Sequence, residues 1–200
     1  PDLVILDSGL VNKLPLNILI TTSLDAFSHG FESYFSKISN EFSKMLAKSS
    51  CLNIITVLQN FEEDHLKHEK LLYSSYFAGL AQSTTSVGII HAISHVISPK
   101  VKLSHGHINS LLIPHVIRLY HDKGVDILSF NSQIGFKNID ESVSFFQKIT
   151  DENNICLISK NSLTIDEKLI NEIRNDMCFK TSPILLNDDE VKNLLEKIID

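Results

Sequence analysis

Apolar residues recur at intervals of three and four positions along most of this chain, which is the pattern of helices that bury one face. The seven glycines and five prolines leave long stretches without a helix breaker. The clearest helical segments are residues 23–37, 41–58, 66–84, 87–97, 108–120, 140–150, 165–176 and 188–199. Residues 122–138 are predicted to be a connecting loop. The pattern therefore predicts an all-α fold of about eight helices.

The ends of these segments carry recognisable signals. Ser23 and Asp140 are predicted to cap helices by accepting hydrogen bonds from free backbone N–H groups. Thr164 precedes an acidic first turn, and so does Asn187. Residues 1–7 differ from the rest, because apolar β-branched residues cluster there just before the turn-forming sequence DSG. That segment predicts a short β-strand.

Composition narrows the classes of function. The chain has 200 residues and a formal net charge of -6, so it lacks the basic surface that nucleic acids or anionic membranes attract. The three cysteines are widely spaced and form no CxxC pair, which favours a reducing, cytoplasmic setting over a disulfide framework. No apolar stretch approaches the roughly 20 residues of a membrane span. One globular domain is the expected organisation.

Small residues dominate residues 77–94, where Ala, Gly and Ser recur. Such a helix packs closely against its neighbours or brings its backbone close to a ligand. The composition alone leaves both interpretations open.

The histidines suggest a metal site, because five of the nine lie between positions 91 and 115. Asp25 and His29 are four residues apart in a predicted helix, so both side chains leave the same face. His91 and His95 repeat this spacing. His105 follows in the sequence SHGH, which predicts a tight loop. Each pair taken alone also fits an ordinary polar pair on a helix.

The other histidines favour simpler explanations. His65, His68 and His121 are surrounded by charged residues and are predicted to lie on solvated faces. His115 follows Pro114 and is predicted to begin a helix or to pack within one.

Several ordered motifs resemble the iron-containing alcohol dehydrogenase family. Residues 25–32 read DAFSHGFE, similar to the family's DAxxHxxE segment. They are followed by AG at 78–79, GIIHAISH at 88–95, HGHIN at 105–109 and LLIPHV at 111–116, which resemble the family's later motifs in the same order. The opening residues 1–15 are similar to the family's lead into its helical domain. The resemblance is strong over about residues 1–120.

The resemblance implies the helical C-terminal domain of a dehydroquinate synthase-like fold. Residues 1–200 would form the metal-binding helical domain, with residues 1–20 as a strand and turn that leave a preceding α/β nucleotide-binding domain. Because the sequence begins at Pro1 rather than Met, we expect a fragment of a longer protein.

The resemblance also implies a ligand set, namely Asp25, His29, His91 and His105 around one divalent metal. His95 would instead lie beside the substrate and pass a proton, although spacing alone would pair it with His91. Glu32 would support the ligands. Related glycerol dehydrogenases and dehydroquinate synthases use three ligands, and the fourteen-residue step from His91 to His105 favours the iron-type pattern.

One carboxylate and three imidazoles suit Fe²⁺ or Zn²⁺. The implied reaction is hydride transfer between an alcohol and NAD or NADP, with a small alcohol or aldehyde as substrate and a homodimer as the assembly. The sequence has no GxGxxG loop, so the nucleotide would be held by the preceding domain. Thr21 and Thr22 are predicted to touch it. We therefore expect little or no dehydrogenase activity from these 200 residues alone.

Three other interpretations stay open on sequence alone. The chain could be a metal-binding domain without catalysis, or a glycerol- or sugar-type polyol dehydrogenase of the same superfamily. It could also be a helical interaction module whose histidines are structural.

Overall fold

The structure, a computed structural model, describes residues 2–62 and 64–200. Within those residues the chain forms helices and no β-strand, which confirms the all-α fold class. The α-helices are α1 (Leu16–Phe35), α2 (Glu41–Gln59), α3 (Lys67–Thr85), α4 (Ile89–Val101), α5 (His105–Asp122), α6 (Ile127–Gln133), α7 (Ile139–Glu152), α8 (Glu167–Asn175), α9 (Met177–Thr181) and α10 (Asp188–Glu196). Two short 3-10 helices, Ser8–Leu10 and Lys160–Ser162, complete the order.

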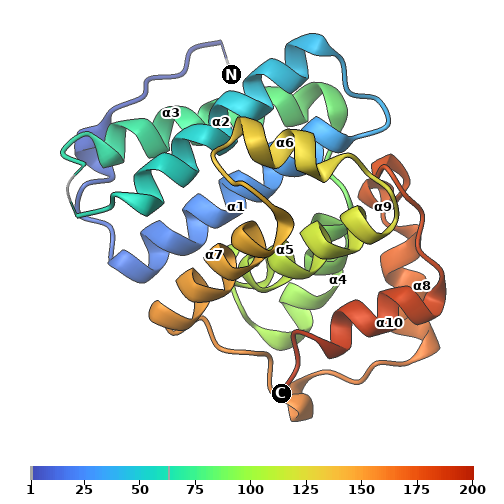
Figure 1. Cartoon of the computed structure of the whole chain (residues 1–200). Helices are drawn as coiled ribbons and strands as arrows, with labels where there is room; N and C mark the ends of the chain where they lie inside the picture. The colour runs from blue at the N-terminus through green and yellow to red at the C-terminus, as the bar shows by residue number, and fades with distance from the viewer. Residues whose placement is uncertain (1, 63) are drawn as a thin grey trace.

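The helices form two groups around α1 and α5. Helices α2 and α3 pack against each other and against α1, and α1 packs in turn on α5. Helix α7 covers α5, while α8 and α9 lie against α4 (Figure 1). In Figure 1 the blue and cyan helices α1 and α2 lie toward the upper left and α8 and α10 toward the lower right. Helices α1, α4 and α5 thus meet in the middle of the chain's fold.

Aromatic rings fill the interior beside α1. Phe27 and Phe31 are fully buried and stack with ring centroids 6.0 Å apart. Phe31 also contacts Tyr120 of α5 and Phe130 of α6, at 5.7 and 5.8 Å between centroids. Because these rings are rigid and large, they fix the distance between α1 and α5.

Helix α1 begins earlier than the sequence predicted. Its first residue is Leu16, after Pro15, and Ser23 lies inside the helix with its hydroxyl donating to the Leu19 carbonyl at 2.6 Å. The predicted cap at Ser23 was therefore wrong. Residues 16–22 are rich in Ile and Thr, which are weak helix formers, but burial of Leu19 and Ile20 outweighs that preference.

Other predicted helix starts shift by a residue or two. The first turn of α7 is capped by Asn138, whose side chain accepts from Glu141 N at 2.8 Å, and not by Asp140. Asp166 caps α8 in place of Thr164. The predicted start at Asn187 is confirmed, since it forms a capping box with Glu190 at the start of α10.

Two predicted irregular segments also differ from the structure. Residues 122–138 contain α6, which is capped by Asp126 and buries Phe130; seven residues are too few to give a clear periodic signal. Residues 2–7 of the predicted strand pair with no neighbour and form no strand, and residue 1 lies outside the described residues. A lone extended segment has no partner for its backbone hydrogen bonds.

Candidate metal centre

Helix α1 carries the first part of a polar cluster. Asp25, His29 and Glu32 lie at intervals of four and three residues, which places them along one face. The His29 Nε2 atom lies 3.8 Å from Asp25 Oδ2, and both side chains are about a quarter exposed, at 23% and 26%. Asp25 and His29 therefore open toward solvent, while Glu32 is buried.

Helix α4 adds His91, whose ring is 1% exposed. Its Nε2 atom lies 3.3 Å from His29 Nε2 and 3.7 Å from Asp25 Oδ1. The other ring nitrogen, Nδ1, faces Glu32 Oε2 at 2.7 Å. When Nδ1 donates to this carboxylate, the lone pair of Nε2 points at Asp25 and His29, as a metal-binding imidazole requires.

Glu32 is held by backbone as well as by His91. Its Oε2 accepts from Gly88 N at 2.8 Å and its Oε1 accepts from Ile90 N at 2.6 Å. A Cβ atom on Gly88 would lie 2.8 Å from Glu32 Oε1, which is too close for any other residue. Glycine at this position therefore lets the start of α4 lie directly against the carboxylate. Part of the small-residue stretch thus packs around Glu32, which bonds to the His91 ring.

The third helix, α5, brings His105. This residue lies in the first turn of α5, so the predicted tight loop at 104–107 was wrong; Ser104 caps the helix by accepting from His107 N. The backbone there nearly touches α1, because a Cβ on Gly106 would lie 2.6 Å from the Thr21 carbonyl oxygen. One donor atom each of Asp25, His91 and His105 lies within 4.8 Å of the others.

Asn109, one turn after His105, completes the surroundings. Its side-chain amide donates to Asp25 Oδ1 at 2.6 Å and lies 3.2 Å from His91 Nε2. Asn109 is the last residue of the sequence motif HGHIN, and its spacing in the sequence gives no sign of this contact. Two buried atoms of the cluster, His29 Nδ1 and Asn109 Oδ1, have no partner among the described residues.

The electrostatics of the cluster suit a cation. Burial opposes a charge on His91, but the facing carboxylates of Asp25 and Glu32 outweigh it and raise its pKa to about 9. Burial and repulsion from His91 lower the pKa of His29 to about 3. Burial also lowers the pKa of His105. One positive charge is therefore favoured among these groups, and a metal ion supplies that charge while leaving the imidazoles neutral.

His95 lies next to the cluster but bonds elsewhere. Its ring stacks on that of His105 with centroids 5.2 Å apart and lies 6.0 Å from that of His91. Its Nδ1 atom lies 3.1 Å from Asp176 Oδ2, and Cys178 Sγ lies 3.9 Å from the same nitrogen. Asp176 and Cys178 could not be predicted from the sequence, since they lie about eighty residues from His95 and carry no periodic signal.

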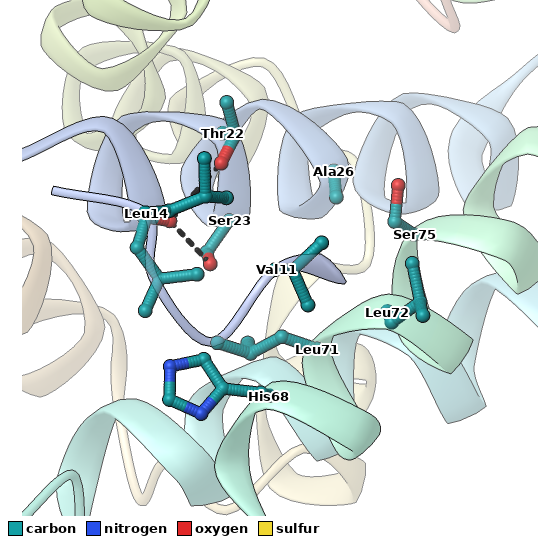
Figure 2. Close-up of a pocket in the computed structure, with 10 residues that line it drawn as sticks. Val11, Leu14, Thr22, Ser23, Ala26, His68, Leu71, Leu72 and Ser75 are labelled. Atoms are coloured by element: carbon teal, nitrogen blue, oxygen red, sulfur yellow. Dashed lines mark hydrogen bonds between the residues drawn. The ribbon is translucent and has the colours of Figure 1, made fainter. Parts of the chain in front are cut away.

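The two threonines predicted to touch a nucleotide point in different directions. Thr21 is buried on the side facing α5, and its hydroxyl donates to the Asn17 carbonyl at 2.8 Å. Thr22 lines a separate cavity of about 120 Å³ between α1, α3 and residues 11–14 (Figure 2). Figure 2 shows the Thr22 and Ser23 hydroxyls both directed at a carbonyl of their own helix. Their contact with a nucleotide stays a prediction.

The geometry defines an all-helical domain with a carboxylate–imidazole centre where three helices meet, and comparison with known proteins gives its family. The family model for "Fe-containing alcohol dehydrogenase family, C-terminal" matches residues 19–199. The chain belongs to the iron-containing alcohol dehydrogenase family and corresponds to its C-terminal part.

Curated relatives agree with this assignment. The chain is 25% identical to an NADPH-dependent butanol dehydrogenase of Clostridium saccharobutylicum, over 98% of this chain and 54% of that protein. It is 32% identical to an NAD-dependent methanol dehydrogenase of Bacillus methanolicus, over 58% of this chain and 31% of that protein. The chain thus spans about half or less of the length of these relatives.

Solved structures share the fold. An iron-containing alcohol dehydrogenase from Thermococcus thioreducens superposes with a TM-score of 0.86 at 20% identity, over 99% of this chain and 55% of that one. A sulfoacetaldehyde reductase from Bifidobacterium kashiwanohense, solved with NAD⁺, gives a TM-score of 0.83 at 21% identity, over 96% of this chain and 53% of that one. Within residues 2–62 and 64–200 no helix is long and apolar enough to cross a membrane.

Proposed function

We propose that this chain supplies the metal site and the substrate side of a metal-dependent, NAD(P)-linked alcohol dehydrogenase. The observation that supports it most is the convergence of Asp25, His91 and His105 from three helices, with Glu32 bonded to the far nitrogen of His91. The family match gives this cluster its chemical context. These side chains suit a metal ion because their nitrogen and oxygen lone pairs face one another, and a cation between them would remove the repulsion.

Asp25, His29, His91 and His105 would hold Fe²⁺ or Zn²⁺. When bound, such a metal supplies a Lewis acid that lowers the pKa of an alcohol or polarises a carbonyl. Glu32 keeps the His91 ring oriented, and Asn109 orients the Asp25 carboxylate. These two residues act by positioning, because they bond to side chains that would hold the metal.

His95 would move the proton on the substrate side. Its side chain is 43% exposed, so it faces solvent as well as the ring of His105. If Nδ1 donates to Asp176, the lone pair of Nε2 is free to accept the proton of an alcohol and pass it outward. The exposure of the ring gives that proton a route to water.

The nucleotide and the substrate would be bound partly by residues outside this chain. The relatives differ in the cofactor that their names state, NADPH in one and NAD in another. Their substrates are small alcohols such as butanol and methanol. We infer a small alcohol or aldehyde as substrate and an α/β domain beyond these 200 residues as the nucleotide site, with Thr21 and Thr22 as contacts from this side.

The metal site is tested by loading the metal-free chain with Fe²⁺ under anaerobic conditions and measuring bound iron. The wild-type chain should bind one equivalent, and His91→Ala should lose it. His121→Ala is the matched control, because His121 lies at the end of α5 away from the cluster. Equal iron in wild type and His91→Ala would show that the histidines are structural only.

Catalysis is tested on the full-length gene product. It should reduce NAD⁺ or NADP⁺ when an alcohol is added, and His91→Ala should lower kcat/KM by a factor on the order of 100 or more. The 200-residue chain alone should give no turnover. Metal binding without turnover in the full-length protein would favour the non-catalytic alternative.

A further inference from the structure

A second group of metal-binding side chains lies beside the first. His95 comes from α4. Asp176 lies between α8 and α9, and Cys178 lies in the first turn of α9, which packs against α4. The three side chains offer one nitrogen, one oxygen and one sulfur within 4.8 Å of one another. None of them belongs to the four ligands proposed above, but His95 is the proposed proton carrier, so the effect of this group on catalysis rests on the proposed function.

The arrangement excludes a nucleophile triad. In a Cys–His–Asp relay the thiol faces one ring nitrogen and the carboxylate the other, so that a proton can cross the ring. Here both Asp176 Oδ2 and Cys178 Sγ face the same nitrogen, His95 Nδ1, at 3.1 and 3.9 Å. Burial also raises the pKa of Cys178 to about 11, which keeps the thiol neutral. Nitrogen, oxygen and sulfur atoms that converge on one point in this way can share a proton or bind a common cation.

We propose that His95, Asp176 and Cys178 form a second divalent-cation site whose best occupant is Zn²⁺. Zinc accepts nitrogen, oxygen and thiolate ligands, and its bond lengths of about 2.0–2.3 Å place tetrahedral ligands about 3.3–3.7 Å apart. The two observed distances fall on either side of that range. The exposed side of His95 leaves the fourth position to water. Binding releases the thiol proton to solvent, and the proton on His95 Nδ1 is replaced by one on Nε2, so the ring stays neutral.

The fold holds these donors in place. Asp176 accepts from Cys178 N with Oδ1, at 2.8 Å, which leaves Oδ2 to face His95. Thr181 of α9 hydrogen-bonds to the Val87 carbonyl, and Ser86 Oγ lies 3.8 Å from Cys178 Sγ. Helix α9 is thus fastened to the segment that leads into α4. Cys178 is 9% exposed, so most of its surface is covered by the surrounding chain.

Occupation of this site would affect His95. A cation at Nδ1 replaces the hydrogen bond to Asp176 and fixes the ring, so His95 would lose its freedom to move a proton. We therefore expect zinc at this site to inhibit, whereas Fe²⁺, a poorer thiolate binder here than Zn²⁺, would occupy it less.

The site is tested with Co²⁺ as a spectroscopic probe and Zn²⁺ for counting, using the metal-free 200-residue chain. A cobalt–thiolate charge-transfer band in the near ultraviolet reports this site alone, because Asp25, His29, His91 and His105 contain no sulfur. The wild-type chain should show the band and bind two equivalents of zinc. Cys178→Ser should lose the band and one equivalent. Cys156→Ser is the matched control, because Cys156 is an exposed thiol elsewhere, and it should keep both.

Other variants separate the two sites. Asp25→Asn should lose the first equivalent and keep the band, so failure of the first site and failure of the second give different results. Should Cys178→Ser fold poorly by circular dichroism, His95→Gln decides instead, because that ring is half exposed; it should also lose the band. A wild-type chain without the band, or a band removed by Cys156→Ser, overturns the proposal.

Discussion

Glu32 Oε2 lies 2.7 Å from His91 Nδ1, and both side chains are almost completely buried. A buried carboxylate is costly unless it is paired, and here it accepts hydrogen bonds from the backbone of Gly88 and Ile90 as well. The pair therefore links α1 to the start of α4 and sets the direction in which His91 Nε2 points.

Glu32→Gln should weaken metal binding without removing any ligand. An amide has only one acceptor oxygen, so its NH₂ group must face at least one of the N–H donors that now bond to Glu32. We expect metal affinity to fall roughly 10–100-fold and the free energy of unfolding to fall by about 1–3 kcal/mol. Both are measured by chelator competition and urea denaturation.

Glu172→Gln is the control for this change, because Glu172 forms an exposed ion pair with Lys100. It should leave metal affinity unchanged and alter stability by less than about 1 kcal/mol. Equal metal affinity in Glu32→Gln and wild type would show that the buried pair has no influence on the metal site.

Gly106→Ala should separate His105 from Asp25. The added methyl group would lie 2.6 Å from the Thr21 carbonyl oxygen and 3.3 Å from Asp25 Cβ, so α5 must move away from α1. We expect a loss of about 1–3 kcal/mol in stability, as for overpacking elsewhere, together with weaker metal binding. Differential denaturation with and without metal measures both effects.

Gly79→Ala provides the opposite case. Gly79 is an exposed residue inside α3, and no atom lies within 4 Å of an added Cβ. Because alanine is the better helix former, this change should stabilise the chain by up to about 1 kcal/mol. Equal free energies of unfolding in Gly106→Ala and Gly79→Ala would show that the close contact between α1 and α5 does not affect stability.

The sequence predicted the long helices well, because their apolar faces repeat for many turns. Helix α2, for example, was predicted as 41–58 and spans Glu41–Gln59. The prediction from sequence was wrong where tertiary contacts determine whether a segment is helical. The first turns of α1 contain weak helix formers that fold through burial, and α6 is too short to show a period.

For the candidate site, the spacing along the sequence identified residues on one helix face but not the side chains that they contact in the fold. The four-residue spacing joins His91 to His95, yet the structure places His91 beside Asp25 and His29, and His95 beside Asp176. The motif order in the sequence separated the two histidines, which local periodicity cannot do. Asp176 and Cys178 reach His95 only through the packing of α9 on α4, so no local pattern revealed them.

Phe31→Ala should disturb the core that holds α1 in register. The ring is fully buried and lies between His29 and Glu32 on the same helix. Its loss leaves a cavity among aromatic rings and should cost about 3–5 kcal/mol. Phe42→Ala, at a ring that is 59% exposed, should change stability by less than about 0.5 kcal/mol. Urea denaturation of the two variants measures the contrast.

His115 should make the fold less stable in mild acid. It lies in the middle of α5 and does not begin that helix, and burial together with the charge of Lys197 lowers its pKa below the ordinary value of 6.5. The unfolded chain therefore takes up a proton near that value while the folded chain does not. Stability is retained above pH 6.5 and is lost as the pH falls below it.

His115→Gln removes the titrating group and isolates its contribution from those of the other histidines. The variant should lose less stability than the wild-type chain between about pH 7.5 and about pH 5.5, a window that spans the ordinary histidine pKa. Urea midpoints at the two pH values measure the difference. His121→Gln, at a histidine in the last turn of α5, is the matched control for the substitution itself. An equal decline in His115→Gln and wild type would mean that His115 is protonated alike in the folded and unfolded chains. Its partial burial and the nearby charge of Lys197 argue against that outcome.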